Sequence, residues 1–137
     1  GDLVSQLVQH GVEVHSLGVC APKGTKAMHT GQAFNKVEVL KGYRVYLAFE
    51  NSQEPGYVTE KIMDGYAAGT VNVYHGAPDI ISFVPDGSYI NLPSGDSVEQ
   101  VAKVVKSVLE KESEWNAFMA WRSQPPLEWK CGGPSKG

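Results

Sequence analysis

The chain has 137 residues, of which 42% are apolar and 20% are charged, proportions typical of a soluble globular fold. No run of sequence approaches the roughly 18 consecutive apolar residues that span a bilayer. The formal net charge of −3 argues against a nucleic-acid-binding surface, which usually carries a basic excess, so any phosphate must be bound by a few placed groups.

The N-terminal part of the chain is predicted to form short elements joined by loops. The first is a helix with Leu3, Leu7 and Val8 on one face and Gly11 after its end. It is followed by a strand over 12–15, which precedes Gly18, and by a loop over 21–35. A small helix closed by Val37 and Leu40 then leads to a strand over 44–49. That strand is rich in β-branched and aromatic residues, which predicts burial on both faces.

The remaining elements alternate in the same way after a turn at Pro55-Gly56. First come a helix from Val58 to Gly69, a strand over 71–74, a helical turn ending at Phe83 and a strand over 88–92. A helix over 97–109 follows, with a capping box of Ser97 and Gln100 and with one apolar face formed by Val98, Val101, Val105 and Val108. Helical spacing continues from Trp115 to Arg122. Such alternation predicts a parallel sheet covered by helices, which binds ligands at the carboxyl ends of its strands.

The polar residues within 49–61 lie between a predicted strand and the first turn of a predicted helix, where backbone N–H groups favour an anion. Lys61 would add a positive charge beside a diphosphate, and Glu60 could accept hydrogen bonds from ribose or sugar hydroxyls. Tyr57 could stack or hydrogen-bond, and Asn51 can donate and accept. The competing interpretation is a solvated helix start, where Glu is favoured by the helix dipole alone.

Other ligand-binding patterns are missing from the sequence. It contains no G-x-G-x-x-G motif, no P-loop lysine and no Asp-x-Asp pair of the kind that holds a divalent ion against a diphosphate. The four histidines lack metal-ligand spacing, so no metal site is predicted. His75 stands apart from the others because it ends a predicted strand and precedes Gly76.

The segments 48–52 (AFENS) and 57–61 (YVTEK) resemble the central motif of the GDP-fucose-dependent α1,3-fucosyltransferase family. The similarity continues through four shorter segments and reaches both ends of the chain. The four shorter segments are 68–71, 76–78, 83–85 and 88–90. Near the two ends, 14–20 is similar to the family's V-D-S-x-G-x-C segment and 129–135 is similar to the tail of the plant-type core enzymes. The resemblance implies the C-terminal, donor-binding half of a GT-B enzyme, which consists of two Rossmann-like halves.

On this resemblance we expect residues 1–123 to form a GDP-fucose-binding, Rossmann-like α/β domain and residues 124–137 to form a C-terminal tail. Because the chain lacks an initiating Met, we expect it to be a piece of a longer protein. The family transfers fucose with inversion, needs no metal at the diphosphate, and carries its acidic base in the N-terminal acceptor domain. We therefore expect no cofactor, no catalytic residue in this fragment, and a GlcNAc-containing glycan acceptor bound through the missing domain.

Carried over by motif, the donor-binding residues are Asn51, Tyr57, Glu60 and Lys61. A second group of donor-pocket candidates consists of Glu50, Thr59, His75 and Gly76. Two alternatives stay open: a non-catalytic nucleotide-sugar-binding module, and a transferase that uses another GDP-sugar.

Three further expectations concern the surroundings of the fragment. A donor-binding arginine of the family is expected just upstream of the first helix, and Asn72 stands where the family often has Pro. Cys20 and Cys131 are either two free thiols or a disulfide, depending on the compartment. Eukaryotic members imply a Golgi membrane protein with this part on the lumenal side.

Overall fold

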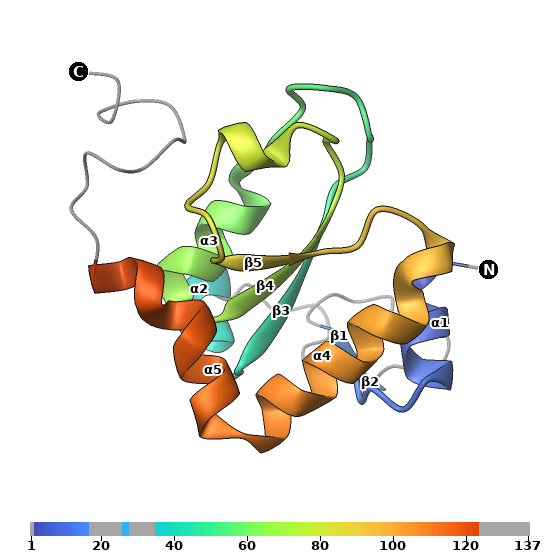
Figure 1. Cartoon of the computed structure of the whole chain (residues 1–137), viewed down its shortest axis with the longest axis vertical. Coiled ribbons are helices and arrows are strands. Elements are labelled where there is room, and N and C mark those ends of the chain that lie inside the picture. The colour runs from blue at the N-terminus through green and yellow to red at the C-terminus, as the bar shows by residue number, and fades with distance from the viewer. Residues whose placement is uncertain (1, 17–25, 28–34, 124–137) are drawn as a thin grey trace.

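All strand pairs among the residues that the structure describes are parallel, as the alternating pattern predicts. The computed structural model describes residues 2–16, 26–27 and 35–123. Strands β3 (Val45–Phe49), β4 (Val71–His75) and β5 (Tyr89–Asn91) form one sheet in that order, and β1 (His15–Ser16) pairs with β2 (Lys26–Ala27) (Figure 1). The predicted α/β class is therefore confirmed.

Helices cover both faces of the three-stranded sheet because successive strand residues point to opposite sides. They are α1 (Leu3–Gln9), α2 (Lys36–Leu40), α3 (Glu60–Ala68), α4 (Val98–Glu110) and α5 (Glu112–Met119), with 3₁₀ turns η1 (Ile80–Ser82), η2 (Gly95–Ser97) and η3 (Ala120–Ser123). On one face Val73 is buried in a core with Leu7 of α1 and Val105 of α4. On the other face Tyr74 is buried with Ile62 of α3. No helix of the described residues is long and apolar enough to cross a membrane.

Glycine signals predicted the helix ends correctly. Gly11 follows α1 with φ +94°, and Gly69 ends α3 with φ +81°, a conformation that a residue without a Cβ adopts at little cost. The start of α3 was predicted at Val58, but the helix begins at Glu60 because the Thr59 side chain accepts a hydrogen bond from the Lys61 N–H (3.3 Å) and so serves as the N-cap.

Four other predictions are corrected by the structure. The capping box at Ser97 is absent, since that residue ends a 3₁₀ turn that continues into α4 without a side-chain cap. The first strand lies at 15–16 rather than 12–15, and the predicted loop 21–35 includes the two residues of β2. Strand β3 was predicted to be buried on both faces, but only Ala48 is fully buried because β3 forms an edge of the sheet. Gly18, Cys20, Cys131 and the predicted tail 124–137 lie outside the described residues.

Helix α3 lies unusually close to β4 at Gly65. The fully buried Asn72 of β4 donates from Nδ2 to the Ile62 carbonyl (3.4 Å) and accepts at Oδ1 from the Thr70 hydroxyl (3.1 Å). A Cβ on Gly65 would lie only 1.8 Å from Asn72 Oδ1 and 2.8 Å from the Tyr46 ring. The helix can therefore keep this contact only with glycine at position 65.

Replacing Gly65 by Ala is expected to destabilise the protein by about 1–3 kcal/mol, because the added methyl overpacks a buried contact and outweighs the better helix propensity of Ala. Denaturant unfolding measures the change. Gly42→Ala is the matched control, since its Cβ would meet only the Val39 carbonyl at 3.6 Å. Equal stabilities of the two variants would contradict the close packing at Gly65.

Candidate functional site

The predicted site residues come together at the carboxyl edge of the sheet. Phe49 and His75, the last residues of β3 and β4, are paired in register, and the N–H of Glu50 donates to the His75 carbonyl (2.7 Å). The loop that follows β3 leads over this edge to the start of α3 and lies beside η1 (Figure 1). Strand ends and a helix N-terminus thus meet at one place, as expected for a ligand site in a parallel sheet.

The carboxylate of Glu50 is the buried centre of this edge, with a fully buried side chain. It accepts hydrogen bonds from the Thr59 hydroxyl (2.6 Å), from the Thr59 N–H (2.9 Å) and from the Tyr74 hydroxyl (3.3 Å). A buried carboxylate is costly unless such donors surround it. The three bonds join the end of β3 to the start of α3 and to β4.

Lys61 lies at the border between this buried carboxylate and solvent. Its ammonium is 3.9 Å from Glu50 Oε1, and its side chain is 27% exposed. The negative charge of Glu50 therefore attracts the ammonium towards the edge of the sheet, while part of the side chain stays accessible. Together with the N-terminus of α3, Lys61 provides positive potential for an anion.

Close packing explains glycine at position 76. A Cβ on Gly76 would lie 2.5 Å from Glu50 Cγ and 2.6 Å from the hydroxyl oxygen of Tyr74. That hydroxyl also accepts from the Ala77 N–H (3.1 Å). Burial raises the pKa of Tyr74 to about 12, against the opposing effect of the Ala77 hydrogen bond and with a contribution from the charge of Glu50. The neutral phenol is therefore a donor to Glu50 at physiological pH.

His75 is tied to the sheet rather than to the loop. Its Nδ1 lies 2.7 Å from the Leu92 carbonyl, which can only accept, and its ring meets Phe49 edge to face at 5.9 Å between centroids. His75 therefore links the carboxyl ends of β3, β4 and the segment after β5. It lies at the carboxyl edge of the sheet, next to Glu50.

The remaining predicted residues present their side chains to solvent around this buried group. Asn51 and Glu60 are exposed, and Tyr57 is 40% exposed. The loop that carries Tyr57 is fixed by a hydrogen bond from the Gly56 N–H to Asp79 Oδ1 (2.9 Å). These three exposed side chains are therefore accessible to a ligand, whereas Glu50 is not.

Sequence reasoning missed two residues of the site, Tyr74 and Asp79. Tyr74 was treated only as part of a strand, although its position at the strand's carboxyl end was a usable signal. Asp79 carries no local motif, and its bond to Gly56 joins residues 23 positions apart. Among the described residues no group of three or more His, Cys, Asp or Glu side chains could hold a metal ion.

The chain is similar to known proteins in sequence and in structure. The family model described as "Glycosyltransferase family 10 (fucosyltransferase) C-term" matches residues 1–131. The chain is similar to GDP-fucose protein O-fucosyltransferase 3 of Gallus gallus (31% identity over 87% of this chain and 26% of that protein). It is also similar to α-(1,3)-fucosyltransferase 7 of Mus musculus (39% identity over 62% of this chain and 22% of that protein).

A solved structure shares the fold as well. It is a crystal structure of α1,3-fucosyltransferase with GDP-fucose, which is 26% identical and superimposes with a TM-score of 0.57 over 80% of this chain and 31% of that one. The chain therefore spans between about a fifth and a third of the proteins it matches.

Glu50→Gln is expected to lower the free energy of unfolding by about 1–3 kcal/mol, because an amide cannot accept both hydrogen bonds from Thr59 and leaves a buried donor unsatisfied. Denaturant unfolding measures the loss. The exposed Glu54→Gln is the control and should change stability by about 0.5 kcal/mol or less. If both variants unfold alike, Glu50 does not organise this edge.

The raised pKa of Tyr74 predicts how the protein responds to alkali. Its folded-state pKa of about 12 exceeds the ordinary value of 10.0, so its contribution to stability is complete below pH 10 and is lost as the pH rises towards 12. Absorbance titration should show one tyrosine that ionises near pH 12, and Tyr74→Phe should remove this ionisation. Tyr57→Phe, at an exposed position, should leave this last step in place.

Proposed function

This chain belongs to glycosyltransferase family 10, the fucosyltransferases, and on that premise we propose that it is the donor-binding part of an inverting enzyme that transfers fucose from GDP-fucose to a GlcNAc-containing glycan. The observation that supports this most directly is the position of Lys61. Its ammonium is held by the buried Glu50 at the carboxyl edge of a parallel sheet, next to the start of α3.

We propose that Lys61 and the α3 N-terminus bind the diphosphate. When the bond between fucose and GDP breaks, negative charge develops on the leaving phosphate oxygens, and a positive group fixed beforehand stabilises that charge without reorganising. Glu50 fixes Lys61 from the buried side, and Thr59 fixes Glu50 through two hydrogen bonds. The helix and the lysine are thus positioned as one unit.

The exposed residues around Lys61 are proposed to contact the rest of the donor. Glu60 offers carboxylate oxygens to sugar or ribose hydroxyls, while Asn51 and the partly exposed Tyr57 line the pocket. His75 and Gly76 border it from the ends of the strands, and Gly76 leaves room for Glu50 behind the loop.

The names of the two reported relatives have fucose transfer in common, but one specifies a protein O-linkage and the other an α-(1,3) linkage. This contrast supports assigning donor recognition to the shared region and the acceptor to other parts of the enzyme. By the same family likeness we propose that the acidic base lies outside this chain, that no metal is needed at the diphosphate, and that the protein acts in the lumen of the Golgi. Use of another GDP-sugar would change the result of donor competition, whereas a non-catalytic module would bind the donor without transferring fucose.

Lys61→Gln is expected to weaken GDP-fucose binding by about 10- to 100-fold, the equivalent of one charged hydrogen bond. Calorimetric titration of the full-length protein and of this chain measures the affinity, with UDP-galactose as the unrelated donor. Lys41→Gln is the matched control, because Lys41 is exposed and pairs only on the surface with Glu38 (2.9 Å). Unchanged affinity in a folded Lys61 variant would remove Lys61 from the site.

Competition separates the donor alternatives. GDP-fucose should displace GDP more effectively than GDP-mannose does, because the sugar-contacting groups would discriminate between the two. Equal competition by both would favour a transferase that uses another GDP-sugar. Selective donor binding without transfer to any acceptor by the full-length protein would favour a non-catalytic module.

A further inference from the structure

The loop between β3 and α3 carries two of the residues proposed to line the donor pocket, Asn51 and Tyr57. Its ends are held together by Glu50, which accepts hydrogen bonds from the N–H (2.9 Å) and the hydroxyl (2.6 Å) of Thr59. At the α3 end Val58 also packs against the buried core. Most residues between these ends are exposed, so a further contact is needed to hold the middle of the loop in one conformation.

The bonds inside the loop join near neighbours and do not supply that contact. The N–H of Tyr57 donates to the Glu54 carbonyl (3.1 Å), and the N–H of Glu54 donates to the Ser52 hydroxyl (3.3 Å). The Gly56 N–H instead donates to Asp79 Oδ1 (2.9 Å). Among the residues that the structure describes, this is the one hydrogen bond that joins the middle of the loop to another segment.

Asp79 belongs to a well-packed part of the fold. It directly precedes η1, and its neighbours Ala77 and Ile80 are buried, with Ile80 in the same core as Tyr74 and Ile62. An aspartate at the start of a helical turn usually accepts hydrogen bonds from the N–H groups of that turn. The side chain of Asp79 makes no such bond, so its carboxylate is used to hold the loop instead.

Gly56 is the position at which the loop most needs to be held. Its φ is +80°, and a Cβ there would meet no atom within 4 Å, so glycine is required for its backbone conformation rather than for space. A glycine also gives a loop many alternative conformations. The bond to Asp79 selects one of them immediately before Tyr57 in the chain.

We propose that Asp79 is a positioning residue of the donor site, which holds Tyr57 in its binding conformation through the Gly56 N–H. This inference rests on the proposed function, because Tyr57 is one of the residues proposed to line the donor pocket. A loop that is ordered beforehand does not have to be ordered when the donor binds. Asp79 therefore raises the affinity for the donor without touching it.

The negative charge of Asp79 is not needed for this role. Accepting one N–H requires only an oxygen atom, which the side-chain amide of asparagine also provides. A carboxylate near an anionic diphosphate would oppose binding rather than favour it. Asp79→Asn should thus preserve the positioning, whereas Asp79→Ala should abolish it, and a role as a base or as a charged ligand group would fail in both variants.

Amide hydrogen exchange in the full-length protein tests the bond between Gly56 and Asp79. Asp79→Ala should make the Gly56 amide exchange about 10-fold faster, because it loses its acceptor. The Thr59 amide, which bonds to Glu50, is the internal control and should exchange at the same rate in both proteins. A Gly56 amide that is equally protected in Asp79→Ala would overturn the inference, whatever the donor is.

Calorimetric titration of the full-length protein with GDP-fucose tests the effect on the donor. Asp79→Ala should weaken the affinity about 3- to 10-fold and raise KM for the donor by a similar factor, with kcat nearly unchanged, because the loop must then be ordered during binding. Asp79→Asn should restore most of the affinity. Asp96→Ala is the matched control, since Asp96 is an exposed aspartate in another 3₁₀ turn, η2.

The outcomes separate this inference from the proposed function. Absence of GDP-fucose binding by the wild-type protein would refute the proposed function. Binding by the wild-type protein that Asp79→Ala leaves unchanged, or a loss that Asp79→Asn shares in full, would refute the positioning role alone.

A double-mutant cycle tests whether Asp79 acts through Tyr57. In a protein that already carries Tyr57→Ala, the further change Asp79→Ala should weaken GDP-fucose binding by less than twofold, because there is no ring left to position. Fully additive losses would overturn the proposed route.

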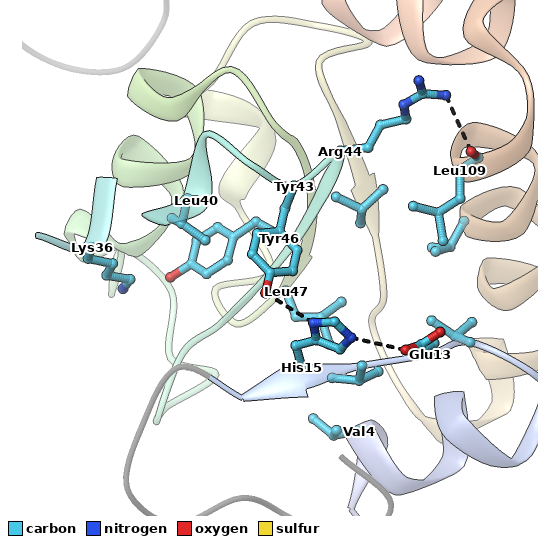
Figure 2. A pocket seen from close by; sticks show the side chains of 14 residues that line it. Val4, Glu13, His15, Lys36, Leu40, Tyr43, Arg44, Tyr46, Leu47 and Leu109 are labelled. Atoms are coloured by element: carbon cyan, nitrogen blue, oxygen red, sulfur yellow. Dashed lines mark hydrogen bonds and ion pairs between the residues drawn. The ribbon is translucent and has the colours of Figure 1, made fainter. Parts of the chain in front are cut away.

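A second control shows whether loss of any hydrogen bond weakens the donor site. Figure 2 shows a mostly apolar cavity of about 470 Å³ beside β3, where His15 Nδ1 lies 3.0 Å from the Tyr43 hydroxyl. None of the eight predicted site residues lines this cavity. Tyr43→Phe should therefore leave the affinity for GDP-fucose unchanged, and an equal loss of affinity in Tyr43→Phe and Asp79→Ala would overturn the inference.

Discussion

The buried carboxylate of Glu50 is the interaction on which the arrangement of this edge depends. A charge removed from water must be matched by donors, and here they come from Thr59 at the start of α3 and from Tyr74 of β4, with Lys61 at 3.9 Å. Satisfying one side chain therefore fixes the relative positions of two strand ends and a helix. The same requirement explains Gly76, because any larger residue would collide with Glu50.

Local signals allowed much of the fold to be predicted, while the exceptions arise from contacts between distant segments. Glycines 11 and 69 set helix ends through their own backbone conformation, so their effect is visible in sequence. The partial exposure of β3 depends on which strand lies beside it, which periodicity does not encode. The position of the site was predictable because a strand end and a helix start adjoin in sequence. The different roles of Glu50 and Lys61 could not be predicted, because the sequence does not show that Glu50 is buried while Lys61 is partly exposed.

Asn72 shows how a departure from a family pattern can be accommodated by the residues around it. Its amide is buried, yet it bonds to α3 and to Thr70, and Gly65 supplies the space. A proline there would donate no backbone hydrogen bond to the neighbouring strand and could not make these side-chain bonds. Helix α3 is thereby bonded at two places, to Glu50 near its start and to Asn72 near its middle.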